Sequence, residues 1–466
     1  MKRILPFLII PLLFISCRNE DESISQEPEY KILSYSESGS LFCSYSYPTV
    51  DENGKPITLS SVLTAWLPTE SDSASTIKSL IIACHITIAS DIECPSMLKA
   101  TSAITDSRCI SLIPSSATIP ALRQSVIIMP DYQGYGVSKQ RIHPYMSQEL
   151  TARQVADAVK YGLMLYDDLE KALPFTQDWK SFCIGFSQGG AVALATHRYI
   201  EQHSLDDELH FVGSFCGDGP YDLLETLRYY VMDDGNSNGV QTTHTKGTIS
   251  MPVVLPLLVK GMIDSNPDMK GHNYSDYFSK QFLDTGIMDW FSEKQKNTNQ
   301  IAEAFYNMCE KGLTAKDGTY YTPEQMQSLF LDHSKSKALV ETTYSVQADI
   351  SKMIKEDLFE YLSDPSAYNT GHHFTGDKFE DLMASLESNS IIKGWEPSHK
   401  IILLHSKYDT VVPYGNLVSF TDSHPNAEIS VRSYGNKDHQ DTGTNFYLAL
   451  LNDTFSDEFT WLFAEK

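Results

Sequence analysis

The stretch Phe182-Cys-Ile-Gly-Phe-Ser-Gln-Gly-Gly-Ala-Val-Ala-Leu194 decides the fold. Its apolar beginning, residues 182–185, predicts a buried strand, and residues 191–200 predict a helix. Between them, glycine stands two residues before and two residues after Ser187. A sharp strand-to-helix turn strains its central residue, so the flanking residues must be small. The stretch therefore predicts a serine exposed at the tip of a turn, beside the free N–H donors of a helix start.

Strand-like and helix-like segments alternate on both sides of this turn. Alternating polar and apolar residues around Asp51-Glu-Asn-Gly54 predict an antiparallel hairpin of residues 41–47 and 57–67. Helical apolar spacing predicts a helix within residues 147–173. Short apolar runs predict buried strands at residues 79–84, 125–129, 211–215, 401–404 and 429–431. This order predicts an α/β class and an α/β-hydrolase fold, a mostly parallel central sheet flanked by helices.

A serine hydroxyl becomes a good nucleophile when a histidine takes its proton and an acid orients that histidine. In this fold the chain order is serine, acid, histidine. Asp409 directly follows the predicted strand 401–404, and His439 lies in a polar loop ahead of a predicted helix at residues 445–451. We therefore predict Ser187 as nucleophile, Asp409 as orienting acid and His439 as general base.

Other titratable residues near these positions have simpler interpretations. His405 lies at a strand end, where either a packed histidine or one that supports the site residues from behind is expected, and Asp438 and Asp441 fit solvated loop acids. The pair His372-His373 lies in a region without catalytic pattern, and no metal role is expected for it.

An acyl-transfer intermediate also needs two N–H donors for its oxyanion. The first is expected from Gln188, the residue after the nucleophile, and the second from the loop after the strand 79–84. That loop reads His85-Ile86-Thr87, so Ile86 and Thr87 are both candidates, and His85 is either part of this site or a structural loop histidine.

The N-terminus indicates an export signal. Lys2 and Arg3 precede an apolar run, residues 4–15, that is too short to span a membrane. Ser16 directly before Cys17 resembles a bacterial lipobox, which predicts cleavage and lipidation of Cys17. We expect an exported outer-membrane lipoprotein facing the periplasm or the cell surface, with its lipid as the sole membrane contact, and ordinary secretion as the alternative.

The alternation of strands and helices stops between Leu224 and Trp395, where aromatic residues and polar helix formers predict a helical insertion. Its apolar run, residues 251–259, is either a lid surface that meets an acyl chain or a packing surface against the main domain. We therefore divide the chain into a signal peptide (1–16), a lipidated tether (17–28), a first core part (29–223), a helical cap or lid (224–395) and a second core part (396–466).

Composition excludes several function classes. Lys and Arg number 36 against 60 Asp and Glu, a net charge of −24 that disfavours nucleic acid. The sequence has no phosphate-binding loop, zinc-spaced Cys/His set or calcium loop. We expect no metal, no organic cofactor and no nucleic-acid partner.

The chain resembles the secretory lipase family of α/β hydrolases typified by a fungal lipase A. The resemblance lies in residues 130–136 (Pro-Asp-Tyr-Gln-Gly-Tyr-Gly), 185–190, 219–222 (Gly-Pro-Tyr-Asp), 408–413 and 438–439. It implies hydrolysis of small-molecule or lipid carboxylic esters through an acyl-enzyme, without metal or organic cofactor, under a helical cap.

Two departures limit what the resemblance carries. The loop at Ile86 lacks the usual glycine, and the insertion has no motif that aligns, so the substrate is not transferred. Two alternatives stay open: a serine peptidase of the prolyl-oligopeptidase type, which lacks support because no propeller-forming region is recognisable, and a non-catalytic lipoprotein that binds carbohydrate or lipid.

Overall fold

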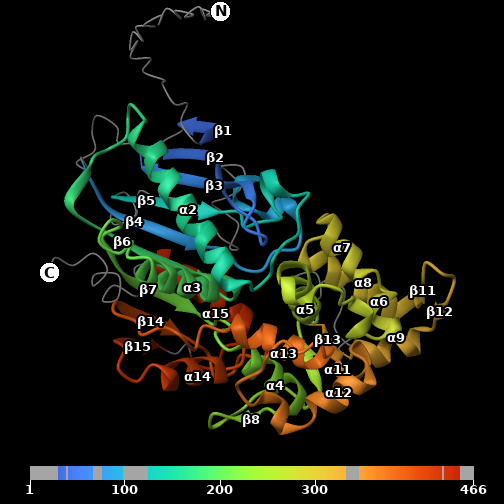
Figure 1. Ribbon diagram of the computed structural model, residues 1–466. Helices are drawn as coiled ribbons and strands as arrows, with labels where there is room; N and C mark the ends of the chain where they lie inside the picture. The colour runs from blue at the N-terminus through green and yellow to red at the C-terminus, as the bar shows by residue number, and fades with distance from the viewer. Residues whose placement is uncertain are drawn as a thin grey trace, which may run out of the picture.

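A nine-stranded sheet forms the centre of the protein (Figure 1). The computed structural model describes residues 30–37, 40–66, 76–97, 124–331, 346–432 and 435–451. The strand order is β1-β2-β3-β5-β4-β6-β7-β14-β15. The strands are β1 (Lys31–Glu37), β2 (Ser40–Val50), β3 (Pro56–Trp66), β4 (Ile77–Cys84), β5 (Ser125–Pro130), β6 (Phe175–Phe186), β7 (Phe211–Gly217), β14 (Lys400–Leu404) and β15 (Ile429–Arg432).

The sheet changes from antiparallel to parallel at β5. Strands β1, β2, β3 and β5 pair antiparallel, and every pairing from β5 onward to β15 is parallel. The crossed order β3-β5-β4-β6 arises because each parallel neighbour is reached through a crossover connection. This arrangement confirms the predicted α/β-hydrolase fold.

The predicted hairpin is confirmed as β2 and β3, which pair from Ser40 with Trp66 to Val50 with Pro56. Its turn is fixed by the Asp51 side chain, whose Oδ1 accepts the N–H groups of Asn53 and Lys55, each at 2.9 Å. Such side-chain-to-backbone bonds are the reason that aspartate favours turns.

Helices cover both faces of the sheet. Helices α2 (Gln148–Asp167) and α3 (Gln188–Gln202) lie side by side on one face (Figure 1). Gly185 of β6 faces α3, because a Cβ there would lie 2.1 Å from the Gly189 carbonyl oxygen. The next residue, Phe186, therefore points to the other face, where its ring contacts Phe446 of α15 (His439–Leu451) at 5.7 Å between centroids.

Between β7 and β14 the chain forms a mainly helical segment, which we call the helical segment (residues 223–388). Figure 1 places it beyond the end of the sheet to which the parallel strands point. The helices among its described residues are α4 (Leu223–Met232), α5 (Val254–Ser265), α6 (Lys280–Leu283), α7 (Ile287–Glu293), α8 (Thr298–Lys311), α9 (Pro323–Leu329), α11 (Ile350–Met353), α12 (Glu356–Leu362) and α13 (Lys378–Ser388).

Short elements complete the described chain. They are the strands β8 (Asn236–Ser237), β9 (Val240–Gln241), β10 (Thr248–Ser250), β11 (Leu313–Thr314), β12 (Tyr320–Tyr321) and β13 (Gln347–Asp349), the 3₁₀ turns η1 (Asp91–Glu93), η2 (Pro95–Met97), η3 (Gly136–Ser138), η4 (Pro267–Met269), η5 (Tyr274–Asp276) and η6 (Pro365–Tyr368), and the helix α14 (Gly415–Ser423).

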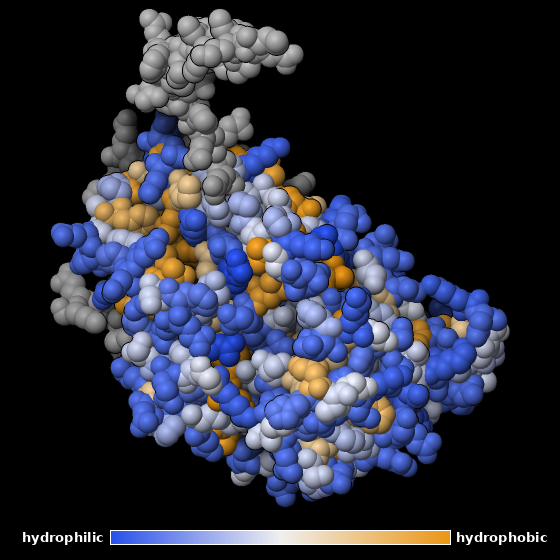
Figure 2. All heavy atoms as spheres, in the orientation of Figure 1, coloured by the Kyte–Doolittle hydropathy of each residue, from blue (hydrophilic) through white to orange (hydrophobic). Residues whose placement is uncertain are grey.

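The helical segment has an apolar interior and a polar exterior. In the apolar run 251–259, the side chains of Leu255, Leu257 and Val259 are buried, which agrees with the packing interpretation of that run. Figure 2 shows a mainly hydrophilic surface over this segment, with apolar residues in small groups. In the described part of the chain, every helix is too short or too polar to cross a bilayer. The predicted signal peptide and Cys17 lie outside the described residues.

Candidate active site

The turn between β6 and α3 holds Ser187 in a strained conformation. Its φ is 57° and its ψ is −125°, outside the regions that ordinary residues prefer. A Cβ at Gly189 would lie 2.1 Å from the Cys84 carbonyl oxygen, and one at Gly185 would meet Gly189 itself. The glycines of the motif are therefore required by backbone contact, and the strain presents the Ser187 hydroxyl at the end of the strand.

The structure brings together the three residues predicted from the sequence. His439 Nε2 lies 2.9 Å from Ser187 Oγ, and His439 Nδ1 lies 2.5 Å from Asp409 Oδ2. These residues stand 252 and 30 positions apart in the chain. Asp409 is fully buried, whereas the His439 side chain keeps 13 % of its surface exposed, and Ser187 is half-buried. The hydroxyl, the imidazole and the carboxylate form one hydrogen-bonded relay.

Backbone donors orient Asp409 within the loop after β14. Its Oδ1 accepts the N–H groups of Val411 and Val412, each at 2.8 Å, which leaves Oδ2 for His439. Burial would raise the pKa of Asp409, but the facing His439 and a hydrogen bond from Asp218 outweigh burial and hold that pKa below its ordinary value. Asp409 is therefore an ionised acceptor for the imidazole N–H.

The prediction that His439 lies in a polar loop is wrong, because His439 is the first residue of α15. The reason is Asp438, whose Oδ1 accepts the Asp441 N–H at 2.9 Å and whose carbonyl oxygen accepts the Thr442 N–H. Aspartate is a strong helix N-cap, and this one starts the helix six residues earlier than the apolar pattern indicated. Asp438 thus orients the neighbouring histidine through the backbone and is not merely a solvated loop acid.

The candidate oxyanion donors lie at the start of α3 and on the loop after β4, which touch each other. Gln188 is the first residue of α3, so its backbone N–H has no intrahelical acceptor. The loop after β4 packs against this helix start, since a Cβ at Gly189 would also lie 2.8 Å from the His85 carbonyl oxygen. Thr87 is held there by a 2.9 Å hydrogen bond between its hydroxyl and Tyr145. Ile86 and Thr87 both stay predictions for the second donor.

His85 has a structural role. Its ring stacks on Tyr132 at 3.9 Å, and its nitrogens face the carbonyl oxygens of Ile86 and Asp131 at 2.7 and 3.2 Å. Burial lowers the pKa of His85 to about 4, so the ring is neutral at physiological pH. His85 therefore fixes the shape of the loop that carries the candidate donors.

The other histidines singled out from the sequence lie apart from the serine. His405 is buried, donates from Nε2 to the Val412 carbonyl oxygen at 2.9 Å, and has a pKa that burial lowers to about 4. His372 contacts Glu380 at 3.0 Å within the helical segment. The packing predicted for His405 is confirmed, and His372 is held by its contact with Glu380.

Among the described residues, two clusters have ligand types that metals use, each with its ligand atoms within 4.8 Å: His197 with Glu201 and His399, and Asp218 with His405 and Asp409. Glu201 already accepts hydrogen bonds from the Trp395 indole at 2.6 Å and from the Ser398 and His399 N–H groups at 3.0 and 2.8 Å. This cluster is explained as a hydrogen-bonded clamp that fastens the chain returning to β14 onto α3.

Asp218, in the second cluster, was not singled out from the sequence. It follows β7 within Gly217-Asp-Gly-Pro220, and a polar residue at the carboxyl end of a buried parallel strand is the signal that could have identified it.

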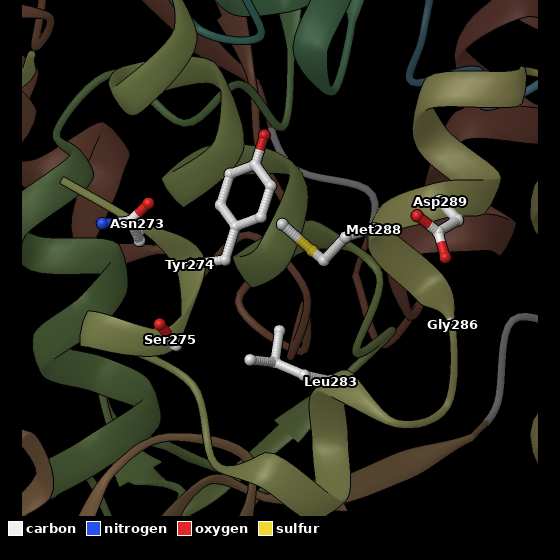
Figure 3. A pocket seen from close by; sticks show the side chains of 7 residues that line it. All are labelled: Asn273, Tyr274, Ser275, Leu283, Gly286, Met288 and Asp289. Atoms are coloured by element: carbon white, nitrogen blue, oxygen red, sulfur yellow. The ribbon is translucent and has the colours of Figure 1, made fainter. Parts of the chain in front are cut away.

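A pocket in the helical segment is separate from this relay. It has a volume of about 290 Å³ and lies among η5, α6 and α7. Figure 3 shows the side chains of Tyr274, Leu283 and Met288 around the hollow, with Asp289 at one side. Its lining residues are Asn273, Tyr274, Ser275, Leu283, Gly286, Met288 and Asp289. None of these belongs to the Ser187 site.

Comparisons with known proteins agree with the fold. No protein-family model and no curated protein matches the chain. Among solved structures, the rice cell wall degrading esterase LipA from Xanthomonas oryzae is similar with a TM-score of 0.62 and 19 % identity, covering 92 % of this chain and 97 % of that one. A hydrolase of Legionella pneumophila, described as putative, has a TM-score of 0.60 and 15 % identity, covering 92 % and 96 %.

Candida antarctica lipase A is similar with a TM-score of 0.53 and 12 % identity, covering 92 % of this chain and 81 % of that one. At such identities the likeness shows the fold alone. The resemblance to lipases noted in the sequence is therefore shown at the level of an esterase- and lipase-like fold.

Proposed function

We propose that this protein is a serine hydrolase that cleaves carboxylic esters through an acyl-enzyme on Ser187. The observation that carries the proposal is the relay of 2.9 Å from Ser187 Oγ to His439 Nε2 and 2.5 Å from His439 Nδ1 to Asp409. Both distances suit proton transfer from a hydroxyl to an imidazole that a carboxylate orients. The esterase- and lipase-like fold supports the same reaction class.

In the first half of the reaction, Ser187 Oγ attacks the ester carbonyl carbon while its proton passes to His439 Nε2. The imidazolium stays hydrogen-bonded to Asp409, whose charge stabilises it. The Gln188 N–H, with Ile86 or Thr87, stabilises the oxyanion. His439 then protonates the leaving alkoxide, and the acyl group remains on Ser187.

In the second half, His439 removes a proton from water, and the resulting hydroxide attacks the acyl carbon. The tetrahedral intermediate collapses, Ser187 recovers its proton from His439, and the carboxylic acid leaves. His439 accepts and then returns the proton in each half of this cycle.

The proposal is tested by labelling the purified protein with a fluorophosphonate and by assaying nitrophenyl esters of increasing acyl length. We expect labelling and turnover for wild type and their loss in Ser187→Ala, with Ser388→Ala, at an exposed position, as control. Full activity of Ser187→Ala would contradict the proposal. Faster cleavage of peptide amides than of esters would favour the peptidase alternative, and absence of labelling would favour a binding protein.

We also propose that residues 224–395 form a cap that shapes the ester site. This is supported by contacts at the loop that carries Asp409: the Tyr230 hydroxyl donates to the Val411 carbonyl oxygen, and Ser250 bonds Thr410 at 3.0 Å between hydroxyls. Changes on the cap should alter KM and acyl-length preference more than the turnover of a short ester.

For localisation we propose an exported lipoprotein anchored through Cys17, from the signal-like residues 1–16 and the lipobox-like Ser16-Cys17. Metabolic labelling with a fatty acid should mark the wild-type protein in the outer-membrane fraction. A Cys17→Ala protein should lose the label and leave that fraction. Labelling that persists in Cys17→Ala would contradict the anchor.

A further inference from the structure

A second buried acid lies against the relay. Asp218 follows β7, has a φ of 36° and is fully buried. Its Oδ1 accepts the Ser406 N–H at 3.0 Å, and its Oδ2 lies 3.9 Å from His439 Nδ1. Asp218 Oδ2 has no N–H or hydroxyl donor within hydrogen-bond distance among the described residues. It faces the carboxyl group of Asp409, with which it forms a close cluster.

The surroundings of Asp218 decide which acid holds a proton. The titratable groups that face it are Asp409 and His405 from the loop after β14, His439 from α15, and Tyr221 beyond β7. Burial keeps His405 and Tyr221 neutral, because it lowers the pKa of the histidine to about 4 and raises that of the tyrosine. No permanent cation among these groups balances two negative charges, and two buried carboxyl groups with oxygens within 4.8 Å of each other do not both ionise.

The unequal donors assign the charge to Asp409. Asp409 receives the Val411 and Val412 N–H groups and the His439 imidazole, whereas Asp218 receives a single N–H from Ser406. Burial and the negative charge of Asp409 together raise the pKa of Asp218 well above its ordinary range. The Asp218 carboxyl is therefore neutral, and its O–H has Asp409 as its acceptor.

We propose that Asp218 is a positioning residue which, as a neutral carboxylic acid, donates a hydrogen bond to Asp409 and keeps that carboxylate ionised and directed at His439. This role rests on the proposed function of Ser187. The donated bond lowers the proton affinity of Asp409, so Asp409 stays negative while His439 carries the serine proton. Asp218 itself touches neither the substrate nor the reacting hydroxyl in this role.

The test compares Asp218→Asn with Asp218→Ala by kcat and KM across pH. We expect Asp218→Ala to lower kcat by about ten- to a hundredfold with KM little changed, because the acid loses part of its orientation. The Asn amide is also a neutral donor, so Asp218→Asn should recover kcat to within a few fold of wild type. Full kcat in Asp218→Ala would overturn the proposal.

The acid limb of the kcat/KM profile separates a neutral Asp218 from a charged one. A negative charge 3.9 Å from His439 Nδ1 would stabilise the imidazolium, so removing that charge would move the limb to lower pH by about one unit or more. We expect Asp218→Asn to keep the limb of wild type, because one neutral group replaces another. A shift of that size in Asp218→Asn would overturn the proposal.

An infrared difference spectrum provides a readout that does not depend on activity. At neutral pH, wild type minus Asp218→Asn should show the C=O stretch of one protonated carboxylic acid. Absence of this band would overturn the neutral state of Asp218 even if the enzyme is active. A band together with no ester turnover in wild type would instead contradict the proposed function.

Discussion

The Ser187 site and the helical segment hold their residues in place in opposite ways. At the site, three side chains from the ends of β6, β14 and the start of α15 meet within two hydrogen bonds of 2.9 and 2.5 Å. The helical segment instead joins the core through scattered contacts, such as the one between the Ser250 and Thr410 hydroxyls at 3.0 Å. Catalysis is thus expected to depend on a few atoms, whereas the position of the proposed cap depends on contacts spread over its surface.

This difference has a consequence for substitution. A change at the site should reduce turnover with little loss elsewhere, whereas a change where the helical segment meets the core should alter stability and leave chemistry almost intact. The following substitutions test the two halves of that contrast.

The largest effect is expected for Asp409→Asn. An amide in place of the carboxylate disfavours the Nδ1–H tautomer of His439 and removes the charge that stabilises its imidazolium, so kcat/KM should fall by about 10⁴-fold. Ester turnover measures this loss, and thermal unfolding shows whether the fold persists. Asp441→Asn, an exposed acid on the same helix as His439, is the control and should keep wild-type turnover. If kcat/KM of Asp409→Asn fell by less than tenfold, turnover would not depend on the Ser187 site in the way proposed.

Gly189→Ala should have the next largest effect. Its Cβ would lie 2.1 Å from the Cys84 carbonyl oxygen. Cys84 belongs to β4 of the central sheet, so its backbone can move only at a cost in stability. We expect a loss of about 3 kcal/mol in unfolding free energy, with turnover also reduced because the Ser187 turn shifts. Urea unfolding measures the first and ester hydrolysis the second.

The matched control is Gly271→Ala in the helical segment. Its φ is +100°, which an alanine adopts with strain, but no atom lies within 4 Å of the added Cβ. We expect a loss of about 1 kcal/mol and unchanged turnover. Equal losses for the two substitutions would show that the Ser187 turn is no tighter than an open loop.

The core could be predicted from the sequence because its physics is local. The glycines at 185 and 189 indicate close backbone contact, and the apolar runs predict buried parallel strands. Asp409 was recognisable because it follows one of these strands. Each of these signals stands within a few residues of the feature it predicts.

The rest depends on contacts between distant residues. The start of α15 at His439 depends on the cap at Asp438, and a polar stretch of this kind also fits a loop. The pairing of Asp218 with Asp409 joins strands that lie far apart in the chain. The arrangement of the helical segment likewise follows from packing among many short helices, which no local pattern encodes.

Glu201→Gln tests the clamp that fastens the chain returning from the helical segment to β14 onto α3. Glu201 on α3 accepts hydrogen bonds from the His197 and His399 rings at 3.0 and 2.8 Å and from Trp395 at 2.6 Å. Losing the charge of this buried acceptor should lower the unfolding free energy by about 2 kcal/mol, with ester turnover kept. Urea unfolding of both proteins measures it.

The pH dependence of that difference follows from the Glu201 carboxyl. Burial would raise its pKa, but the facing histidines and the indole N–H outweigh burial and hold the pKa below 4.5. The stabilisation is therefore complete above pH 4.5 and declines as the pH falls below it. Glu149→Gln, at a partly exposed ion pair with Arg198, is the control and should change stability by less than about 0.5 kcal/mol. A Glu201→Gln effect no larger than this control would contradict the clamp.

The smallest effect is expected for Lys294→Met, where α7 meets the core. Lys294 Nζ donates to the Lys139 and Arg141 carbonyl oxygens at 2.8 and 2.6 Å, and burial, with the charge of Lys260, lowers its pKa to about 8. The Lys294 amine has its ordinary pKa of 10.5 in the unfolded chain, so the unfolded chain binds the proton more tightly than the folded protein. Between pH 8 and 10.5 the unfolded chain keeps this proton and the folded protein loses it, so the unfolding free energy rises with pH over this range.

The stability of wild type relative to Lys294→Met should therefore rise over that window, while ester turnover at neutral pH stays within a few fold. Urea unfolding of both proteins at pH about 7.5 and about 9.5 measures the change, and Lys139→Met, at an exposed side chain, should show none. A relative stability that does not change with pH would mean that the amine is solvated in the folded protein. The contact between α7 and the core would then be as loose as the scattered contacts elsewhere on the helical segment.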